Sequence, residues 1–119
     1  MYGRKTKVPK IDRSYSRQAT EAAELLGSLI RAARLERNMT AEALAERAGV
    51  SLPLLRRIEK GVMGVSLGAA FEVASIVGVP LFESDPDKLA MRLESERRTG
   101  ALLRKRAFQA SNRTVNDDF

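Results

Sequence analysis

Apolar residues recur at helical spacing through the middle of the chain, between residues 21 and 83. A first helix is predicted from about 21 to 38, with an inner stripe at Leu26, Leu29, Ile30 and Ala33. Thr40 is a natural N-cap for a second helix, which is expected to end at Gly49. The inner stripe of this second helix is formed by Leu44, Ala45 and Ala48.

A third helix is predicted to follow the second after only a few residues. Ser51 is its N-cap, Pro53 fits its first turn, and Lys60 lies at its end. Its inward positions are Leu55 and Ile58. Two short helices with so brief a connection have the spacing of a helix-turn-helix motif.

The remaining elements are also predicted to be helical. Ser66 is expected to cap a fourth helix, with a buried stripe at Leu67, Ala70, Phe71, Ala74 and Val77. Leu81 and Phe82 are expected to fold back and seal the core. A helix over 86–98 is then kinked or interrupted at Thr99 and Gly100, followed by a short helical stretch over 102–108 and an extended tail over 111–119. No segment alternates as a strand would, so the chain is predicted to be all-α.

Charge divides the chain into three parts. Residues 1–20 contain six basic residues and one acidic residue. Residues 21–83 contain seven basic and eight acidic residues, and residues 84–119 contain eight basic and six acidic residues. Residues 1–20 are predicted to be a disordered basic arm, 21–83 a folded domain, and 84–119 a helical extension and tail. A basic arm on a nearly neutral domain suits a polyanion such as DNA, although a solvated tail explains the same charge.

The composition removes several kinds of chemistry. Cysteine, histidine and tryptophan are absent, which leaves no disulfides, no thiolate nucleophiles and almost no zinc ligands. No catalytic arrangement of the remaining polar residues stands out, so we expect a binding protein without metal or cofactor rather than an enzyme. We also expect a cytoplasmic protein, because no apolar run suits a membrane span or a secretory signal.

Residues 26–81 resemble the phage-repressor (Cro/C1, or XRE) type of helix-turn-helix. The likeness rests on LGSLIRAAR at 26–34, MTAEALAERAGVS at 39–51, LLRRIEKG at 54–61 and SLGAAFEVASIVGVPL at 66–81. It implies a five-helix phage-repressor-like domain with an additional C-terminal helix and a flexible basic N-terminal arm. It also implies a structural ion pair between Arg34 and Glu59.

The same resemblance implies how DNA is bound. The third helix enters the major groove while the second braces across the backbone. DNA contacts are then assigned to Thr40, Ser51, Leu52, Pro53, Arg56, Arg57 and Lys60. Arg57 is the candidate for a bidentate contact with guanine, whereas Arg56 and Lys60 are expected at phosphates. The alternative is that the arginines of the third helix form a solvated face and do not contact DNA. Many members of the family have polar residues where this chain has Ala41, Leu52 and Pro53, which leaves the specificity open.

Partners are also implied. One domain contacts a half-site of double-stranded DNA, so we expect a homodimer. Residues 86–108 are the candidate surface for a dimer or a partner, or else a brace on the domain. The C-terminal ending, Asp117, Asp118 and Phe119, is similar to that of HipB-like antitoxins, which neutralise a HipA-type kinase toxin and repress their own operon. A stand-alone phage-type regulator and a protein-interaction adaptor with weak DNA binding are the alternatives.

Overall fold

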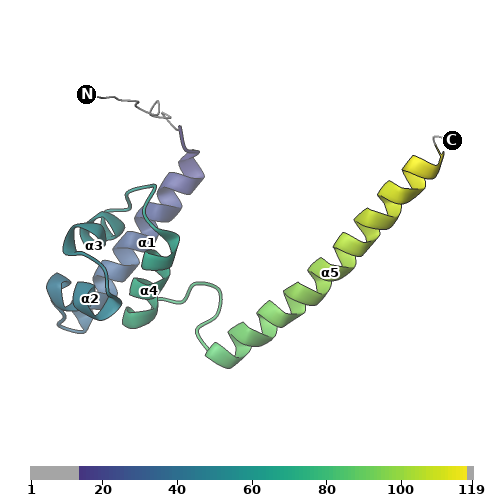
Figure 1. Cartoon of the computed structure of the whole chain (residues 1–119). Helices are drawn as coiled ribbons and strands as arrows, with labels where there is room; N and C mark the ends of the chain where they lie inside the picture. Colours follow the sequence, from purple (N-terminus) through teal and green to yellow (C-terminus); the bar gives the residue numbers. More distant parts are fainter. Residues whose placement is uncertain (1–13, 118–119) are drawn as a thin grey trace, which may run out of the picture. The chain divides into compact units, whose positions relative to one another are not determined.

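The computed structural model describes residues 14–117, with side chains up to residue 113. These residues form five helices and no strand, namely α1 (Arg17–Glu36), α2 (Ala41–Ala48), α3 (Leu52–Glu59), α4 (Leu67–Val77) and α5 (Pro86–Asp117). The chain divides after Val79 into two compact units, of which the first contains α1 to α4 and the second contains α5 (Figure 1). The predicted all-α fold is confirmed.

Each of the four helices of the first unit begins at a capping hydroxyl. In every case the hydroxyl oxygen accepts a hydrogen bond of 3.0–3.2 Å from the backbone N–H three residues later. The capping residues are Ser16, Thr40, Ser51 and Ser66. α2 and α4 end at Gly49 and Gly78, whose φ values of 69° and 79° are left-handed. The positions predicted for α2, α3 and α4 are thereby confirmed.

α1 begins at Arg17, earlier than the predicted start at residue 21. The prediction followed the apolar stripe, but the first turn of α1 is stabilised by polar groups instead. Ser16 caps this turn, and the Arg17 guanidinium lies 3.1 Å from the Glu21 carboxylate one turn further on. Residues 17–20, which were assigned to the basic arm, are therefore helical. Residues 1–13 of that arm lie outside the described residues.

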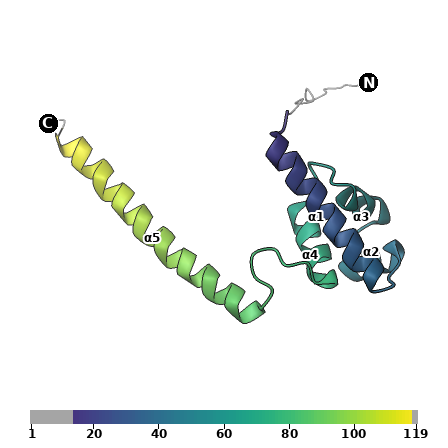
Figure 2. The same ribbon diagram turned by 180° about the vertical axis from the view of Figure 1, so that it is seen from behind.

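The first unit packs around a small apolar core. Its largest fully buried side chains are Ile30, Leu44, Leu55, Val73 and Val77. α1 and α2 each pack against both α3 and α4, and the helices enclose this core together (Figure 2). The inward positions predicted for Leu44, Ala45, Leu55 and Ile58 are confirmed.

Some apolar residues that were predicted to be buried lie at the surface. Leu29, Leu67, Phe71 and Phe82 are between 41% and 76% exposed. α1 turns Gly27, Ile30 and Arg34 inward, so its buried face is rotated away from the apolar stripe that was predicted. Ile30 is buried as predicted and Leu29 is not. The inward places of Gly27 and Arg34 were missed because a glycine and an arginine do not register in an apolar pattern. In α4, Val73 lies in the core and Phe71 does not.

α5 is one continuous helix. The predicted interruption at Thr99 and Gly100 is wrong, and residues 111–117 are helical rather than extended. A single interior glycine costs a helix only about 1 kcal/mol relative to alanine, and good helix formers surround this one. The Asp85 carboxylate accepts a hydrogen bond of 3.0 Å from the Asp87 N–H at the start of the helix. The side chains of residues 86–113 are exposed, except that Gly100 is half-buried.

Candidate nucleic-acid interface

One side of α3 packs into the core, and the opposite side is cationic. Pro53, Arg56, Arg57 and Lys60 are exposed, and their spacing of three and four residues places them on one helix face. None of the three cations forms an ion pair within the described part of the chain. α3 and its C-cap residue Lys60 therefore present three positive charges to solvent.

The other residues predicted to contact DNA lie at the N-terminal ends of α2 and α3. Thr40 and Ser51 are exposed, and Leu52 is half-buried. The Thr40 hydroxyl accepts a hydrogen bond from the Ala43 N–H at 3.0 Å, and the Ser51 hydroxyl accepts one from the Leu54 N–H at 3.2 Å. Each hydroxyl keeps its own proton to donate. Both are thus suited to donate to a phosphate oxygen while they cap their helices.

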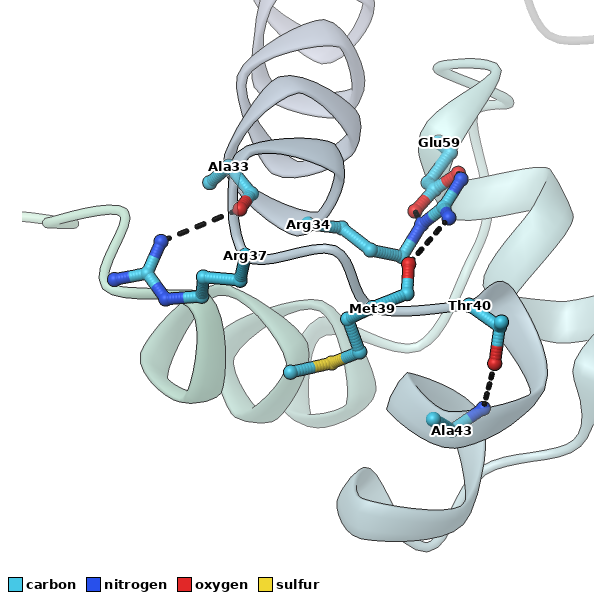
Figure 3. A network of polar contacts seen from close by, with 7 residues as sticks. All are labelled: Ala33, Arg34, Arg37, Met39, Thr40, Ala43 and Glu59. Atoms are coloured by element: carbon cyan, nitrogen blue, oxygen red, sulfur yellow. Dashed lines mark hydrogen bonds and ion pairs between the residues drawn. The ribbon is translucent and has the colours of Figure 1, made fainter.

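A buried ion pair from α1 holds the end of α3 in place. Arg34 Nε and Nη2 donate to the two carboxylate oxygens of Glu59 at 2.7 and 3.0 Å (Figure 3). Arg34 Nη1 also donates to the Met39 carbonyl at 3.0 Å. Only 10% and 8% of the Arg34 and Glu59 side chains are exposed. Because the contact is bidentate and charge-assisted, it fixes orientation as well as distance. Arg34 therefore ties α1 both to α3 and to the segment that leads into α2.

The charge on Arg34 is stabilised by these contacts. The hydrogen bond to Glu59 is the main cause that raises the pKa of Arg34 above its usual value. Burial acts in the opposite direction, and the negative charges of Glu59 and Glu42 add to the increase. These contacts therefore favour the charged form of Arg34.

Two glycines allow α1 and α3 to approach closely. A Cβ atom on Gly27 would lie 2.5 Å from the carbonyl oxygen of Ile58 and 2.6 Å from that of Glu59. A Cβ atom on Gly61, where the chain leaves α3, would lie 2.6 Å from the Cα atom of Glu24. The atoms in the way belong to the backbone, so a larger residue at either position would push α3 away from α1. Sequence analysis missed Gly27, although an interior glycine in a predicted helix is a signal of close packing.

Comparison with protein families agrees with this geometry. The family model described as helix-turn-helix matches residues 30–84. Residues 30–84 therefore have the fold of a helix-turn-helix domain. The match supports an assignment to the XRE type of helix-turn-helix, and with it the role of a DNA-binding transcriptional regulator. Searches among curated proteins and among solved structures found no match.

In the helix-turn-helix domain, α2 and α3 are the paired helices, and α3 occupies the place of the recognition helix. The match begins at Ile30, so the first part of α1, including Gly27, precedes it. One of the close contacts between α1 and α3 is therefore formed by a residue that precedes the matched region.

The tail residues assigned to a partner have no described side chains. Asp118 and Phe119 lie outside the described residues, as does the side chain of Asp117.

Among the described residues, no three metal-ligating side chains gather at one place. No helix in the described part of the chain combines the length and the apolar character needed to cross a membrane.

Proposed function

We propose that this chain is a transcriptional repressor that binds operator DNA with α3 in the major groove. The observation that carries the proposal is the exposed cationic face of α3, on a helix held by Arg34 and Gly27. The major groove of B-DNA admits one α-helix, and its walls are lined by phosphates. Arg56 and Lys60 are suited to contact these phosphates, which fix the register of the helix on the duplex.

Arg57 is the residue proposed to read a base. Its guanidinium can donate two hydrogen bonds to O6 and N7 of a guanine, which is worth about 1–3 kcal/mol of discrimination. Leu52 and Pro53 offer only apolar contacts, such as one to a thymine methyl group. Specificity then depends on Arg57 together with the shape and deformability of the DNA.

Two copies are proposed to bind one operator. A single helix-turn-helix domain covers a half-site, and dimers of such domains bind half-sites one helical turn or a multiple of it apart. A footprint with two-fold symmetry on the operator is therefore expected.

The direct test compares two variants on two DNA duplexes, the fragment upstream of the protein's own gene and a random sequence of equal length. Arg57→Ala is expected to weaken binding to the upstream fragment about tenfold or more, with little change on random DNA, because it removes a base contact. Lys60→Ala is expected to weaken binding to both duplexes alike and to reduce the salt dependence by about one phosphate contact. Equal losses on both duplexes for Arg57→Ala would contradict the base-reading role. A wild-type protein that binds neither duplex at low salt would contradict the whole proposal.

We further propose that the regulator is an antitoxin that represses its own operon and neutralises a HipA-type kinase toxin. Support comes from the ending Asp117-Asp118-Phe119, whose acidic and aromatic residues resemble those of HipB-like antitoxins. An aromatic side chain is suited to fill a pocket on a partner. Deletion of residues 116–119 is expected to spare operator binding and to weaken binding of a kinase encoded by the neighbouring gene. Unchanged kinase affinity after this deletion would refute the role of the tail.

A further inference from the structure

α5 carries an apolar stripe that lies open to solvent. Five residues at helical spacing form this α5 stripe, namely Leu89, Leu93, Gly100, Leu103 and Ala107. Its three leucines are between 44% and 55% exposed. Helices in proteins gain most of their stability by packing an apolar face against another surface. The α5 stripe therefore indicates a surface for a partner.

Arginines border the stripe along both edges. Each of them lies three or four residues from a member of the stripe, with Arg97 and Arg104 on one edge and Arg92 and Arg106 on the other. Arg97 lies 3.5 Å from the Glu94 carboxylate in an exposed contact, which is a weak kind of pair. The other three border arginines form no ion pair within the described residues. Both edges of the stripe are thus positively charged.

A second copy of α5 matches this surface poorly. Glu96 lies in line with the stripe, between Leu93 and Gly100. In a parallel pair of identical helices each seam residue meets its own counterpart, so Glu96 would face Glu96. In an antiparallel pair each basic edge would meet the same basic edge of the other copy. In a parallel pair the two basic edges would meet each other. Arginines therefore approach arginines along the edges in both arrangements, and such like-charge contacts oppose association.

We propose that the α5 stripe docks on a different protein, one that presents an apolar groove bordered by carboxylates on both sides. The three leucines enter the groove, and the border arginines pair with the carboxylates. Glu96 then meets a basic or hydrogen-bond-donating group. This inference rests on the side chains of α5 alone, so it stands or falls separately from the DNA-binding role of α3.

The test uses a peptide that has the complementary charges. It copies residues 86–110 with the substitutions Arg92→Glu, Glu96→Arg, Arg97→Glu, Arg104→Glu and Arg106→Glu. A second peptide of the same length keeps the native charges. Binding of each labelled peptide to the full chain is measured by fluorescence anisotropy. The acidic peptide is expected to bind at least about tenfold more tightly than the native-charge peptide, and its affinity is expected to fall as salt screens the charged border.

Variants of the full chain show whether the stripe is the site. Leu93→Asp and Leu103→Asp are expected to abolish binding of the acidic peptide. Met91→Asp and Leu102→Asp are the matched controls, because these residues are 69% and 60% exposed on the opposite face of α5. They are expected to leave peptide binding unchanged. Circular dichroism is used to check that all four variants stay helical.

Three results would overturn the inference. Equal affinity for the two peptides would show that charge does not select the occupant. A lower mass in light scattering for the stripe variants than for the wild-type chain would show that a second copy covers the stripe. The third result has two parts. Substitution of the border arginines weakens binding to duplex DNA, and the stripe variants bind both the acidic peptide and DNA as the wild-type chain does. This result would assign the arginines to DNA instead.

Discussion

Replacing Gly27 with alanine tests whether the contact between α1 and α3 positions the recognition helix. In an unobstructed helix interior this substitution stabilises a protein by about 1 kcal/mol, because alanine is the better helix former. Here the new Cβ would lie 2.5 Å from the Ile58 carbonyl oxygen and 2.8 Å from the Glu59 carbonyl carbon. No side-chain rotation can relieve contacts with backbone atoms, so α3 has to move. Overpacking of this kind costs about 1–3 kcal/mol, and rigid backbone contacts place Gly27→Ala at the upper end of that range.

Gly68→Ala is the matched control for this substitution. Gly68 also lies in a helix, but the nearest atom to its added Cβ would be the Ser66 Oγ at 3.9 Å. Propensity alone then acts, and we expect a gain in the free energy of unfolding of about 0.5–1 kcal/mol. Scanning calorimetry of the full chain separates the two cases, since 1 kcal/mol shifts the Tm of a domain of this size by about 4–8 °C.

Gly27→Ala is therefore expected to lower the Tm of the first unit by about 12–24 °C, and Gly68→Ala to raise it by a few degrees. Operator binding is measured well below both transitions, where both variants are folded. Gly27→Ala is expected to weaken it because α3 is displaced, whereas Gly68→Ala leaves it unchanged. A Gly27→Ala protein as stable as Gly68→Ala, with wild-type operator affinity, would refute the reasoning.

Three further predictions concern residues of the interface and its frame. Arg34→Ala and Glu59→Ala each leave a buried charge unpaired, and each is expected to lower the free energy of unfolding in urea by about 3–5 kcal/mol. The double variant is expected to lose much less than the sum of the two, and additive losses would show that the two side chains act independently. Thr40→Ala is expected to destabilise the first unit by about 1 kcal/mol and Thr40→Ser by much less, because serine keeps the capping oxygen; equal losses would contradict the capping role. Arg57→Lys is expected to lose operator selectivity nearly as fully as Arg57→Ala, since lysine lacks the planar fork; wild-type selectivity in Arg57→Lys would show a simple charge contact.

Much of the first unit was predictable because its signals are local. A hydroxyl residue before a helix and a glycine after it act within a few residues, so α2, α3 and α4 were placed correctly from the sequence. The start of α1 was misplaced because a hydroxyl cap and an Arg17–Glu21 pair do not appear in an apolar pattern. The rotation of α1 was missed for a related reason, since its inward face includes Gly27 and Arg34.

Long-range contacts were beyond a derivation from spacing alone. The pairing of Arg34 with Glu59 spans 25 residues of sequence, and only the family resemblance implied it. The close approach of Gly27 to α3 was not anticipated at all. The continuity of α5 was missed because Gly100 was treated as a breaker, although one glycine is a modest penalty in a long helix of good helix formers.

The contacts that orient α3 against α1 matter more for DNA recognition in this chain than in one whose α3 begins with polar residues. α3 has only eight residues, and Leu52 and Pro53 at its start cannot donate hydrogen bonds from their side chains to a base. Under the proposed function, sequence reading then depends on where one guanidinium, that of Arg57, arrives in the groove. A bidentate contact tolerates only small errors of distance and angle, so the orientation of α3 decides whether it forms. The Arg34–Glu59 pair and the absence of a side chain at Gly27 together set that orientation. Changes buried between α1 and α3 are therefore expected to alter the choice of operator without any change in the residues that touch DNA.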